Sequence, residues 1–405
     1  MRILVLCQEL PPVGGGGGRA AFGLARQWAR CHHVDYVTER SRGFPAREVL
    51  DGVHVYRTFS FGRHDLDAAA PSAHLAYAVS GVACGLGLLG HGRYDVINSH
   101  FAVPSGALGL VLSAVSGTPH VASVHGADVY EPFRRLSPNR CWPVGTAVRL
   151  ALGKAWCVVA QSRDTAQRVL DHCGEGIRRK LCVIPLGFDP AQTAPFVTGR
   201  EAARAECRLQ AGACYIVSVG RLIKRKGFDR LIQAMAYLPQ DVRLVIVGSG
   251  PLRGELEELA RRSGLADRVQ LAGRVTDKLK YGYLSAADAF VLSSEHEGFG
   301  VVLQEAMAAG LPVVAVGHGG QADLLEDGVN ALLVDSNEPR GLAGAVQRVL
   351  TDSELRAAMC EANRRKLKAY DASAMAQRYV QLFREAVASA GSGRLSAWQR
   401  AGRLL

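Results

Sequence analysis

Short continuous runs of valine, isoleucine and leucine recur along this chain, separated by longer segments in which apolar residues return at helical spacing. Single glycines stand at the ends of many of these runs. Continuous apolar runs are typical of strands that a parallel sheet buries on both faces. In the first half they predict strands over 2–7, 33–38, 53–58, 94–98, 119–124, 156–161 and 180–184, with helices over 18–30, 72–89, 104–115, 143–153 and 163–172.

The second half repeats this rhythm after a stretch without a strand, between Pro185 and Gly212. The pattern predicts strands over 213–219, 242–247, 268–272, 288–292, 312–316 and 330–334, with helices over 227–237, 251–263, 276–286, 300–309, 320–326 and 338–351. Beyond residue 353 it predicts helices only, over 353–368 and 373–388. Such alternation of strand and helix predicts two doubly wound α/β domains.

These elements divide the chain into four segments. We expect an N-terminal Rossmann-like domain over 1–190, an interdomain linker over 191–212, a second Rossmann-like domain over 213–370, and over 371–405 a helix that crosses back to the first domain, followed by a tail. Doubly wound sheets bind ligands at the carboxyl ends of their strands, so the expected site is a cleft that the two domains face.

Composition narrows the class of partner. The 405 residues include 48 basic and 37 acidic side chains, a net charge of +11, which suits phosphate-bearing ligands, an anionic membrane surface or nucleic acid. The sequence has no zinc-finger spacing and no long Lys/Arg block, so nucleic acid is the least favoured partner. Its ten cysteines form no CxxC pair and lie mostly in apolar runs, which indicates reduced, packed thiols.

Membrane-spanning segments are not expected. The apolar run 3–7 is too short for a signal peptide, and the apolar stretches 75–90 and 101–117 are better explained as buried helices than as spans. The basic tail 394–405 has Leu395, Trp398 and Leu405 at roughly helical spacing, which would suit a membrane surface. Such terminal segments more often pack against the rest of the protein than bind a membrane.

The strongest chemical signal surrounds Glu297 and Glu305. A buried strand ends at Leu292, a glycine loop follows, and Gly310 stops a short helix. Glycines allow backbone N–H groups to approach a ligand closely, and a helix N-terminus favours oxygen-rich or anionic groups. The two carboxylates are then suited to accept hydrogen bonds from hydroxyls of one ligand, although a solvated loop and helix face would also explain them.

This segment resembles the retaining GT-B glycosyltransferases of family 4, also called glycosyl transferases group 1. The resemblance rests on seven residues between the two glutamates, around Gly298-Phe299-Gly300, and on Ala306-Met307 after the second glutamate. It implies two Rossmann-like domains, an acceptor-side first domain and a nucleotide-sugar-binding second domain. It also implies that Glu297 contacts donor-sugar hydroxyls, that the backbone of Gly298, Phe299, Gly300 and Val301 contacts sugar and phosphate, and that Glu305 binds the ribose.

A second signal is a basic turn after the apolar run that ends at Val219. Cations at the carboxyl end of a strand stabilise the charge that a departing diphosphate develops. The resemblance gives this role to Arg221 and Lys226, whereas Lys224 and Arg225 are expected to face solvent. We expect Lys226→Ala to abolish turnover while changing folding stability much less. A basic turn without a ligand is the alternative.

The N-terminal strand leads into five glycines, Gly14 to Gly18, before a helix. Such a loop suits a phosphate or an acceptor, but neither the dinucleotide fingerprint nor a P-loop is present. The resemblance assigns donor contacts to Gly15 and Gly16. A flexible loop without a ligand is the alternative.

His125 follows the apolar run 119–124, where a side chain is able to donate a hydrogen bond to a sugar hydroxyl. A lone histidine is more often structural, but the resemblance places this one beside the donor sugar. Asp128 is expected to orient the loop rather than to contact substrate.

Weaker elements complete the candidate site. By resemblance the backbone at Arg274 and Val275 meets the nucleobase, and Asp323 stands where a glutamate is usual. The Asp65-Leu66-Asp67 triplet matches the metal-binding element of another glycosyltransferase fold, but so short a pattern specifies little. We predict no bound metal and no cofactor.

Together these features predict a retaining glycosyltransferase. It would move a hexose-type sugar from a UDP- or GDP-sugar to a hydroxyl of a sugar or lipid-linked acceptor, in cell-envelope glycan, glycolipid or polysaccharide synthesis. We expect front-face displacement, a cytoplasmic location and peripheral contact with the inner, anionic face of the plasma membrane. The alternatives are a nucleotide-sugar 2-epimerase of the same fold, a sugar phosphorylase and a non-catalytic nucleotide-sugar-binding protein.

Overall fold

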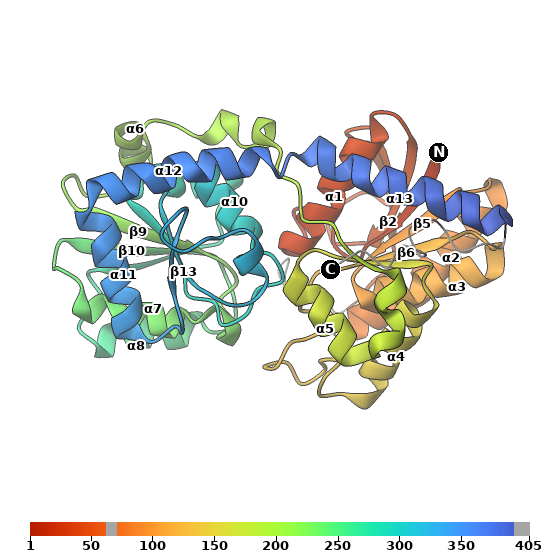
Figure 1. Ribbon diagram of the computed structural model, residues 1–405, viewed down its shortest axis with the longest axis horizontal. Coiled ribbons are helices and arrows are strands. Elements are labelled where there is room, and N and C mark those ends of the chain that lie inside the picture. Colours follow the sequence, from red (N-terminus) through yellow and green to blue (C-terminus); the bar gives the residue numbers. More distant parts are fainter. Residues whose placement is uncertain (62–70, 393–405) are drawn as a thin grey trace. The chain divides into compact units, whose positions relative to one another are not determined.

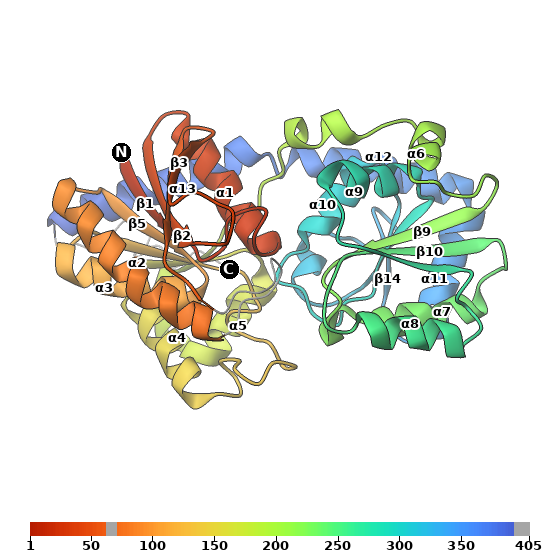
Figure 2. The same cartoon turned by 180° about the vertical axis from the view of Figure 1, so that it is seen from behind.

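The computed structural model describes residues 1–61 and 71–392, and it divides into two compact units. The first unit comprises residues 1–187 together with the segment that begins at Ala372, and the second unit comprises Phe188–Asp371. Each unit contains one twisted sheet covered by helices (Figures 1 and 2).

The first unit has an eight-stranded sheet in the order β3-β4-β2-β1-β5-β6-β7-β8. All neighbouring strands are parallel except β3, which runs antiparallel to β4 at the edge. The strands are β1 (Arg2–Leu6), β2 (His33–Glu39), β3 (Arg47–Leu50), β4 (Val53–Thr58), β5 (Val96–His100), β6 (His120–Val124), β7 (Cys157–Ala160) and β8 (Leu181–Val183). The helices are α1 (Gly16–Ala29), α2 (Pro71–His91), α3 (Ala107–Ser116), α4 (Trp142–Lys154), α5 (Arg163–Cys173) and α13 (Ala372–Ser392).

Strand β1 shows why this sheet is buried on both faces. Its odd residues, such as Ile3, pack on the face covered by α1 and α13, where Trp28 and Phe383 lie. Its even residues, such as Leu4, pack on the face covered by α2 and α3, where Leu112 lies. Strand residues with apolar partners on both sides are what a continuous apolar run predicts.

The second unit has a six-stranded, fully parallel sheet in the order β11-β10-β9-β12-β13-β14. Its strands are β9 (Cys214–Val219), β10 (Val242–Val247), β11 (Val269–Gly273), β12 (Ala289–Leu292), β13 (Val313–Val316) and β14 (Leu332–Val334). Its helices are α6 (Arg200–Glu206), α7 (Phe228–Ala234), α8 (Arg253–Arg262), α9 (Asp277–Ala286), α10 (Val301–Ala308), α11 (Pro339–Thr351) and α12 (Ser353–Lys368).

The predicted two-domain α/β architecture is confirmed, and three local predictions differ from the structure. Strand β3 was not predicted, because Arg-Glu-Val-Leu is half polar and forms only an edge strand. The segment 320–326 forms only a short 3₁₀ turn, Gly320–Asp323. Residues 191–212, expected as a linker, lie within the second unit, where Arg204 of α6 ion-pairs with Asp288 at 2.8 Å.

Helix α2 also differs from expectation, since it is buried on one side only. Its small residues Gly81 and Gly85 admit Leu108 and Leu112 of α3, while Leu75 and Val79 on its outer side are 66% and 68% exposed. In the described part of the chain, Ser72–His91 is a helix long and apolar enough to cross a membrane by length and composition, with a mean hydropathy of 1.5. Packing against the sheet equally explains its apolar inner side.

Two expectations concern residues outside the described ranges. The Asp65-Leu66-Asp67 triplet and the basic tail 394–405 both lie there. Within residues 1–61 and 71–392, no three His, Cys, Asp or Glu side chains converge as metal ligands would.

Candidate active site

A buried cluster of opposite charges lies at the carboxyl edge of the second sheet. Lys226, in the 3₁₀ turn Lys224–Lys226 after β9, ion-pairs with Glu297, which follows β12. Arg225 Nη1 lies 3.3 Å from Glu297 Oε2, and Ser294 Oγ donates to Glu297 Oε1 at 2.7 Å. The side chains of Lys226 and Glu297 are only 10% and 9% exposed, so this carboxylate meets cations in a site largely shielded from water.

The cluster shifts the pKa of both members of the pair. Burial alone would raise the pKa of Glu297, but the charges of Lys226 and Arg225, together with hydrogen bonds from Lys226 and Ser294, lower it to about 2. Burial lowers the pKa of the Lys226 ammonium group; Glu297 opposes this shift, while Arg225 and Arg221 add to it. Glu297 is therefore a carboxylate at neutral pH, able to accept hydrogen bonds but not to act as a general acid.

Adjacent strands explain why these residues meet. β12 pairs with β9 in the sheet, so the loops after both strands leave from the same edge. Ser293 Oγ donates to the Lys226 carbonyl oxygen at 2.8 Å and ties the two loops together. Gly227 has φ +61°, and a Cβ there would collide with the Ser293 carbonyl oxygen, so this close approach requires glycine.

The prediction that Arg225 faces solvent is wrong. Its guanidinium group bonds the His296 carbonyl oxygen at 2.8 Å as well as Glu297, and its side chain is 15% exposed. Lys224 does face solvent, with 55% exposure and a surface ion pair to Asp229. Sequence position alone cannot separate these neighbours, because their direction depends on the 3₁₀ turn. Arg221, half-buried just after β9, lies near enough to influence the pKa of Lys226.

Glu305 forms a second buried ion pair on α10. Its Oε1 atom lies 2.5 Å from Nζ of Lys280, a lysine of α9 that also lies 3.3 Å from Asp277. Both Lys280 and Glu305 are almost fully buried. Sequence reasoning missed Lys280, although its place beside Tyr281 on the inward face of α9 was a signal.

The loop that leads into α10 can contact a ligand mainly through its backbone groups. Phe299 is buried, with its ring 5.8 Å from that of Tyr370, so its side chain belongs to the core. Gly300 caps α10 with φ +95°, and Val301 is the first helical residue. The first N–H groups of a helix have no partner within the helix, so Gly300 and Val301 are placed to donate hydrogen bonds at the same edge as Lys226.

Arg274 and Val275 follow β11 at this same carboxyl edge. Gly273 ends the strand with φ +74°, Arg274 is exposed and Val275 is half-buried. Helix α9, which carries Lys280, begins two residues later. The second unit therefore gathers all its predicted site residues along one edge of its sheet.

In the first unit, the glycine loop already holds a carboxylate. Glu9 Oε2 accepts hydrogen bonds from the N–H groups of Gly15, at 2.9 Å, and Gly18, at 3.2 Å. A Cβ at Gly14 or Gly18 would collide with the Glu9 side chain. Gly15 and Gly16 thus lie at the N-terminus of α1 as expected, but an anion arriving at Gly15 would compete with Glu9. Sequence reasoning missed Glu9, which follows β1 by three residues.

His125 lies at the carboxyl end of β6. Its Nε2 atom is 3.1 Å from Nδ1 of His100 and 3.3 Å from Nε2 of Gln161. Burial lowers the pKa of His125 to about 4, so the ring is neutral at neutral pH. Asp128 accepts from the backbone N–H groups of His125, at 2.9 Å, and Ala102, at 2.8 Å, and so orients the loop as expected.

Comparison with known proteins identifies the family. Residues 199–366 match the model of glycosyl transferases group 1, and residues 14–192 match that of glycosyltransferase family 4. A D-inositol 3-phosphate glycosyltransferase of Xylanimonas cellulosilytica is 30% identical over 374 residues, which cover 86% of this chain and 87% of that protein. The chain belongs to the glycosyl transferases group 1 family.

Other similar proteins of this glycosyltransferase family come from bacteria and archaea. An uncharacterized glycosyltransferase of Methanocaldococcus jannaschii, MJ1607, is 31% identical over 87% of this chain and 90% of its own length. The lipopolysaccharide core biosynthesis glycosyltransferase LpsD of Rhizobium meliloti is 37% identical over 53% of this chain and 60% of its own.

Solved structures confirm the GT-B fold of this glycosyltransferase. Sucrose-phosphate synthase of Thermosynechococcus elongatus superposes with a TM-score of 0.83 at 25% identity, covering 96% of this chain and all of that one. Anabaena HepE in complex with UDP-glucose superposes with a TM-score of 0.74 at 24% identity, covering 97% and 100%.

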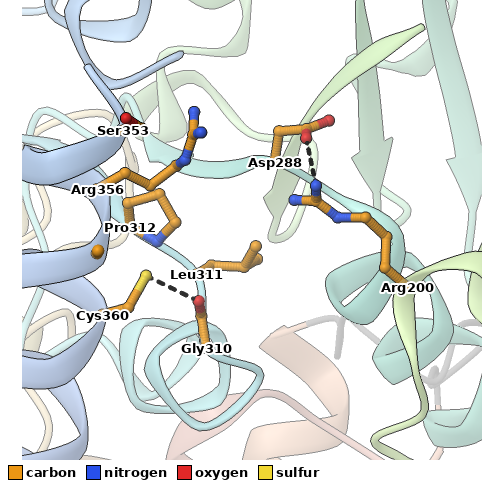
Figure 3. Close-up of a pocket in the computed structure, with 9 residues that line it drawn as sticks. Arg200, Asp288, Gly310, Leu311, Pro312, Ser353, Arg356 and Cys360 are labelled. Atoms are coloured by element: carbon orange, nitrogen blue, oxygen red, sulfur yellow. Dashed lines mark hydrogen bonds and ion pairs between the residues drawn. The ribbon is translucent and has the colours of Figure 1, made fainter. Parts of the chain in front are cut away.

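A shallow pocket of the second unit lies away from these residues (Figure 3). It lies between α12 and the residues just before β12 and β13, where Arg200 ion-pairs with Asp288 at 2.9 Å and Cys360 donates to the Gly310 carbonyl oxygen. These are the amino ends of the strands. Ligands of doubly wound sheets bind at the opposite, carboxyl edge, so this pocket is not the glycosyltransferase site.

Proposed function

We propose that this glycosyltransferase moves a hexose from a UDP- or GDP-sugar to a hydroxyl of a sugar or lipid-linked acceptor, with retention of the anomeric configuration. The observation that carries the proposal is the buried Lys226–Glu297 pair flanked by Arg225 and Arg221. Shielded cations stabilise a diphosphate that gains charge as the glycosidic bond breaks. The neighbouring N-terminus of α10 adds backbone donors.

The reaction in this proposal is a front-face displacement. The bond between the anomeric carbon and the diphosphate oxygen breaks, the acceptor oxygen bonds that carbon on the same face, and the acceptor proton passes to the leaving diphosphate. Lys226 and Arg221 hold the diphosphate. Glu297, a carboxylate because of its low pKa, accepts hydrogen bonds from sugar hydroxyls rather than donating a proton. His125 donates to the sugar, and Glu305 binds the ribose.

Related proteins support the choice of substrates. HepE of Anabaena has been solved with UDP and with UDP-glucose, which supports a nucleotide-sugar donor for this chain. LpsD and LpsE of Rhizobium meliloti are named for lipopolysaccharide core biosynthesis, which supports an acceptor from the cell envelope. We propose no metal and no cofactor. We also propose a cytoplasmic location, where ten free cysteines would stay reduced, and contact of this basic protein with the anionic inner membrane face.

One experiment separates this function from its rivals. The full chain is incubated with a panel of nucleotide sugars, with and without sugar and lipid-linked acceptors and with and without inorganic phosphate, in buffer containing EDTA. Release of nucleoside diphosphate and an NMR assignment of the product anomer as that of the donor are expected. Isomerised sugar from donor alone would indicate an epimerase, consumption of free phosphate a phosphorylase, and binding without turnover a non-catalytic protein.

A further inference from the structure

The hydrogen bonds around the His125 ring are unequal. Its Nε2 atom faces two nitrogens, Nδ1 of His100 and Nε2 of Gln161, at 3.1 and 3.3 Å. Its Nδ1 atom is buried and has no hydrogen-bond partner within the described residues. His100 and Gln161 are themselves buried: His100 ends β5 and Gln161 follows β7, the two strands on either side of β6.

Counting protons fixes which nitrogen of His125 carries its hydrogen. A neutral imidazole has one donor and one acceptor nitrogen, and an amide nitrogen only donates. Because the amide nitrogen of Gln161 faces Nε2 of His125 at 3.3 Å, Nε2 is the acceptor nitrogen, and His100 Nδ1–H shares its single lone pair. The proton of His125 then lies on Nδ1. The reverse arrangement, with the proton of His125 on Nε2, requires the Gln161 amide to be turned over so that its oxygen faces the ring.

The surroundings of the ring point to a ligand site. Phe101, whose ring centroid lies 4.6 Å from that of His125, has φ +72°, a backbone conformation that is strained for a phenylalanine. A Cβ at Gly17 of the glycine loop would collide with the Phe101 ring and lie 3.4 Å from His125. Strained residues and a close glycine loop at the carboxyl edge of a doubly wound sheet are typical of a binding position.

We propose that His100 and Gln161 are positioning residues that hold His125 as the neutral Nδ1–H tautomer, so that Nδ1–H is a fixed donor to an oxygen of the bound donor sugar. The functional half of this statement rests on the proposed transferase activity. The tautomer itself is a property of the protein without substrate. The acceptor atom belongs to the class of sugar hydroxyl or ring oxygens, since these carry lone pairs and no charge.

The tautomer is measured by ¹⁵N NMR of the full chain labelled at histidine, with His125→Asn used to assign the His125 signals. A pyrrole-type Nδ1 and a pyridine-type Nε2 are expected in the unliganded protein. Gln161→Glu is expected to reverse the two signals, because a carboxylate requires a donor from Nε2. A pyrrole-type Nε2 in the wild-type protein would overturn the inference.

Kinetics test the functional half. His100→Leu removes the donor to Nε2 and is expected to lower kcat/KM for the donor about tenfold, as is Gln161→Glu. His100→Asn keeps an N–H near the same place and is expected to recover most of that loss. His120→Asn is the control: this histidine of β6 is equally buried but bonds Ser99 rather than His125, at 2.7 Å. A loss in His120→Asn as large as that in His100→Leu would show a merely structural role.

The two proposals fail differently. If no nucleotide sugar is turned over but the Nδ1–H signal is present, the proposed function is wrong and the tautomer assignment stands. If the enzyme transfers sugar while His125 shows Nε2–H, or while Gln161→Glu retains wild-type kcat/KM, the inference drawn here is wrong. Because Gln161→Glu changes the ring signals without removing His100, it keeps the test decisive even if His100→Leu does not fold.

Discussion

At the scale of single residues, the buried pair of Lys226 and Glu297 matters for both activity and stability, so replacing either residue is expected to lower both. The same burial that strengthens the hold of Lys226 on a diphosphate makes each partner costly to lose, because the other is left buried without its closest counter-charge. Without Lys226, Glu297 keeps only Arg225 and Ser294 as polar partners. The expectation from sequence, that a change at Lys226 lowers turnover far more than folding stability, did not include the buried ion pair with Glu297. Separate measurements on single and double variants are therefore needed to distinguish the effect on activity from the effect on stability.

Lys226→Met is expected to lower kcat more than about 100-fold and the free energy of unfolding by about 3 kcal/mol. The double variant Lys226→Met/Glu297→Gln removes both charges and is expected to recover most of the stability but none of the activity. Lys224→Met, at the solvent-facing neighbour, is the control and is expected within about 0.5 kcal/mol of wild type. Urea unfolding and diphosphate release measure the two effects. Recovery of turnover in the double variant would remove Lys226 from the mechanism.

Buried titratable groups of the first unit make its stability depend on pH. His120 and His125 bind protons near pH 6.5 when unfolded but only near pH 4 when folded, because burial lowers their pKa. Acidification from pH 6.5 to 4 therefore favours unfolding. Asp128, whose pKa burial raises to about 6, opposes this over part of the window.

The effect of the two histidines is larger than the opposing effect of Asp128. The free energy of unfolding of the first unit is therefore expected to fall by about 3 kcal/mol between pH 6.5 and pH 4 because of these three groups. His120→Asn removes one of the titrating groups and is expected to flatten that dependence by about as much. Urea unfolding at several pH values, followed by tryptophan fluorescence, provides the measurement. An unchanged slope in His120→Asn would show that its imidazole is already protonated in the folded protein above pH 4.

At the scale of elements, the site depends on turns that join parallel strands to helices. Gly227 caps α7 in the left-handed region and allows the Lys226 turn to contact the loop after β12. A side chain there has no space, because the contact is with backbone rather than with a movable side chain.

Gly227→Ala is expected to lower the free energy of unfolding by at least about 2 kcal/mol, from the left-handed backbone and the collision with Ser293. It is also expected to lower donor turnover, because the Lys226 turn must shift. Gly254→Ala on α8, where a Cβ meets open space, is the matched control and is expected to stabilise by about 0.5–1 kcal/mol. Thermal unfolding and diphosphate release compare the two variants. Equal stability in both would contradict the close contact.

At the scale of the whole molecule, the chain leaves the first unit at Gly187 and returns to it at Ala372. Helix α13 completes the core of the first unit: Phe383 is fully buried, with its ring 5.2 Å from that of Trp28, and Trp28 Nε1 donates to the Ala376 carbonyl oxygen. The stability of the first unit therefore depends on residues almost 200 positions beyond its last strand.

Phe383→Ala is expected to destabilise the first unit by about 3–5 kcal/mol, because it leaves a cavity against Trp28. Amide hydrogen exchange should show lost protection in β1 and β5 and unchanged protection in β9 and β12. Val387→Ala, on a more exposed position of the same helix, is the control. Equal loss of protection in both sheets would mean that the units unfold together.

The two-domain α/β fold and the positions of the described strands other than β3 were determined by the sequence alone. Continuous apolar runs report burial on both faces, and glycine turns report where strands end; both signals are local. The same dependence on local signals explains why β3 was not predicted. This short edge strand is half polar and buries too little surface to require a continuous apolar run. The family motifs around Glu297 were likewise visible because they lie within one short segment.

The partners of the site residues were decided only by the tertiary structure. Arg225 turns onto Glu297, Lys280 meets Glu305, Glu9 fills the amides of the glycine loop, and His100 and Gln161 face His125. In each case the contact depends on which loops or strand ends lie side by side, or on how one turn directs a side chain. No local pattern of apolar and polar residues records that arrangement, because it is set by the pairing of strands that are distant in sequence.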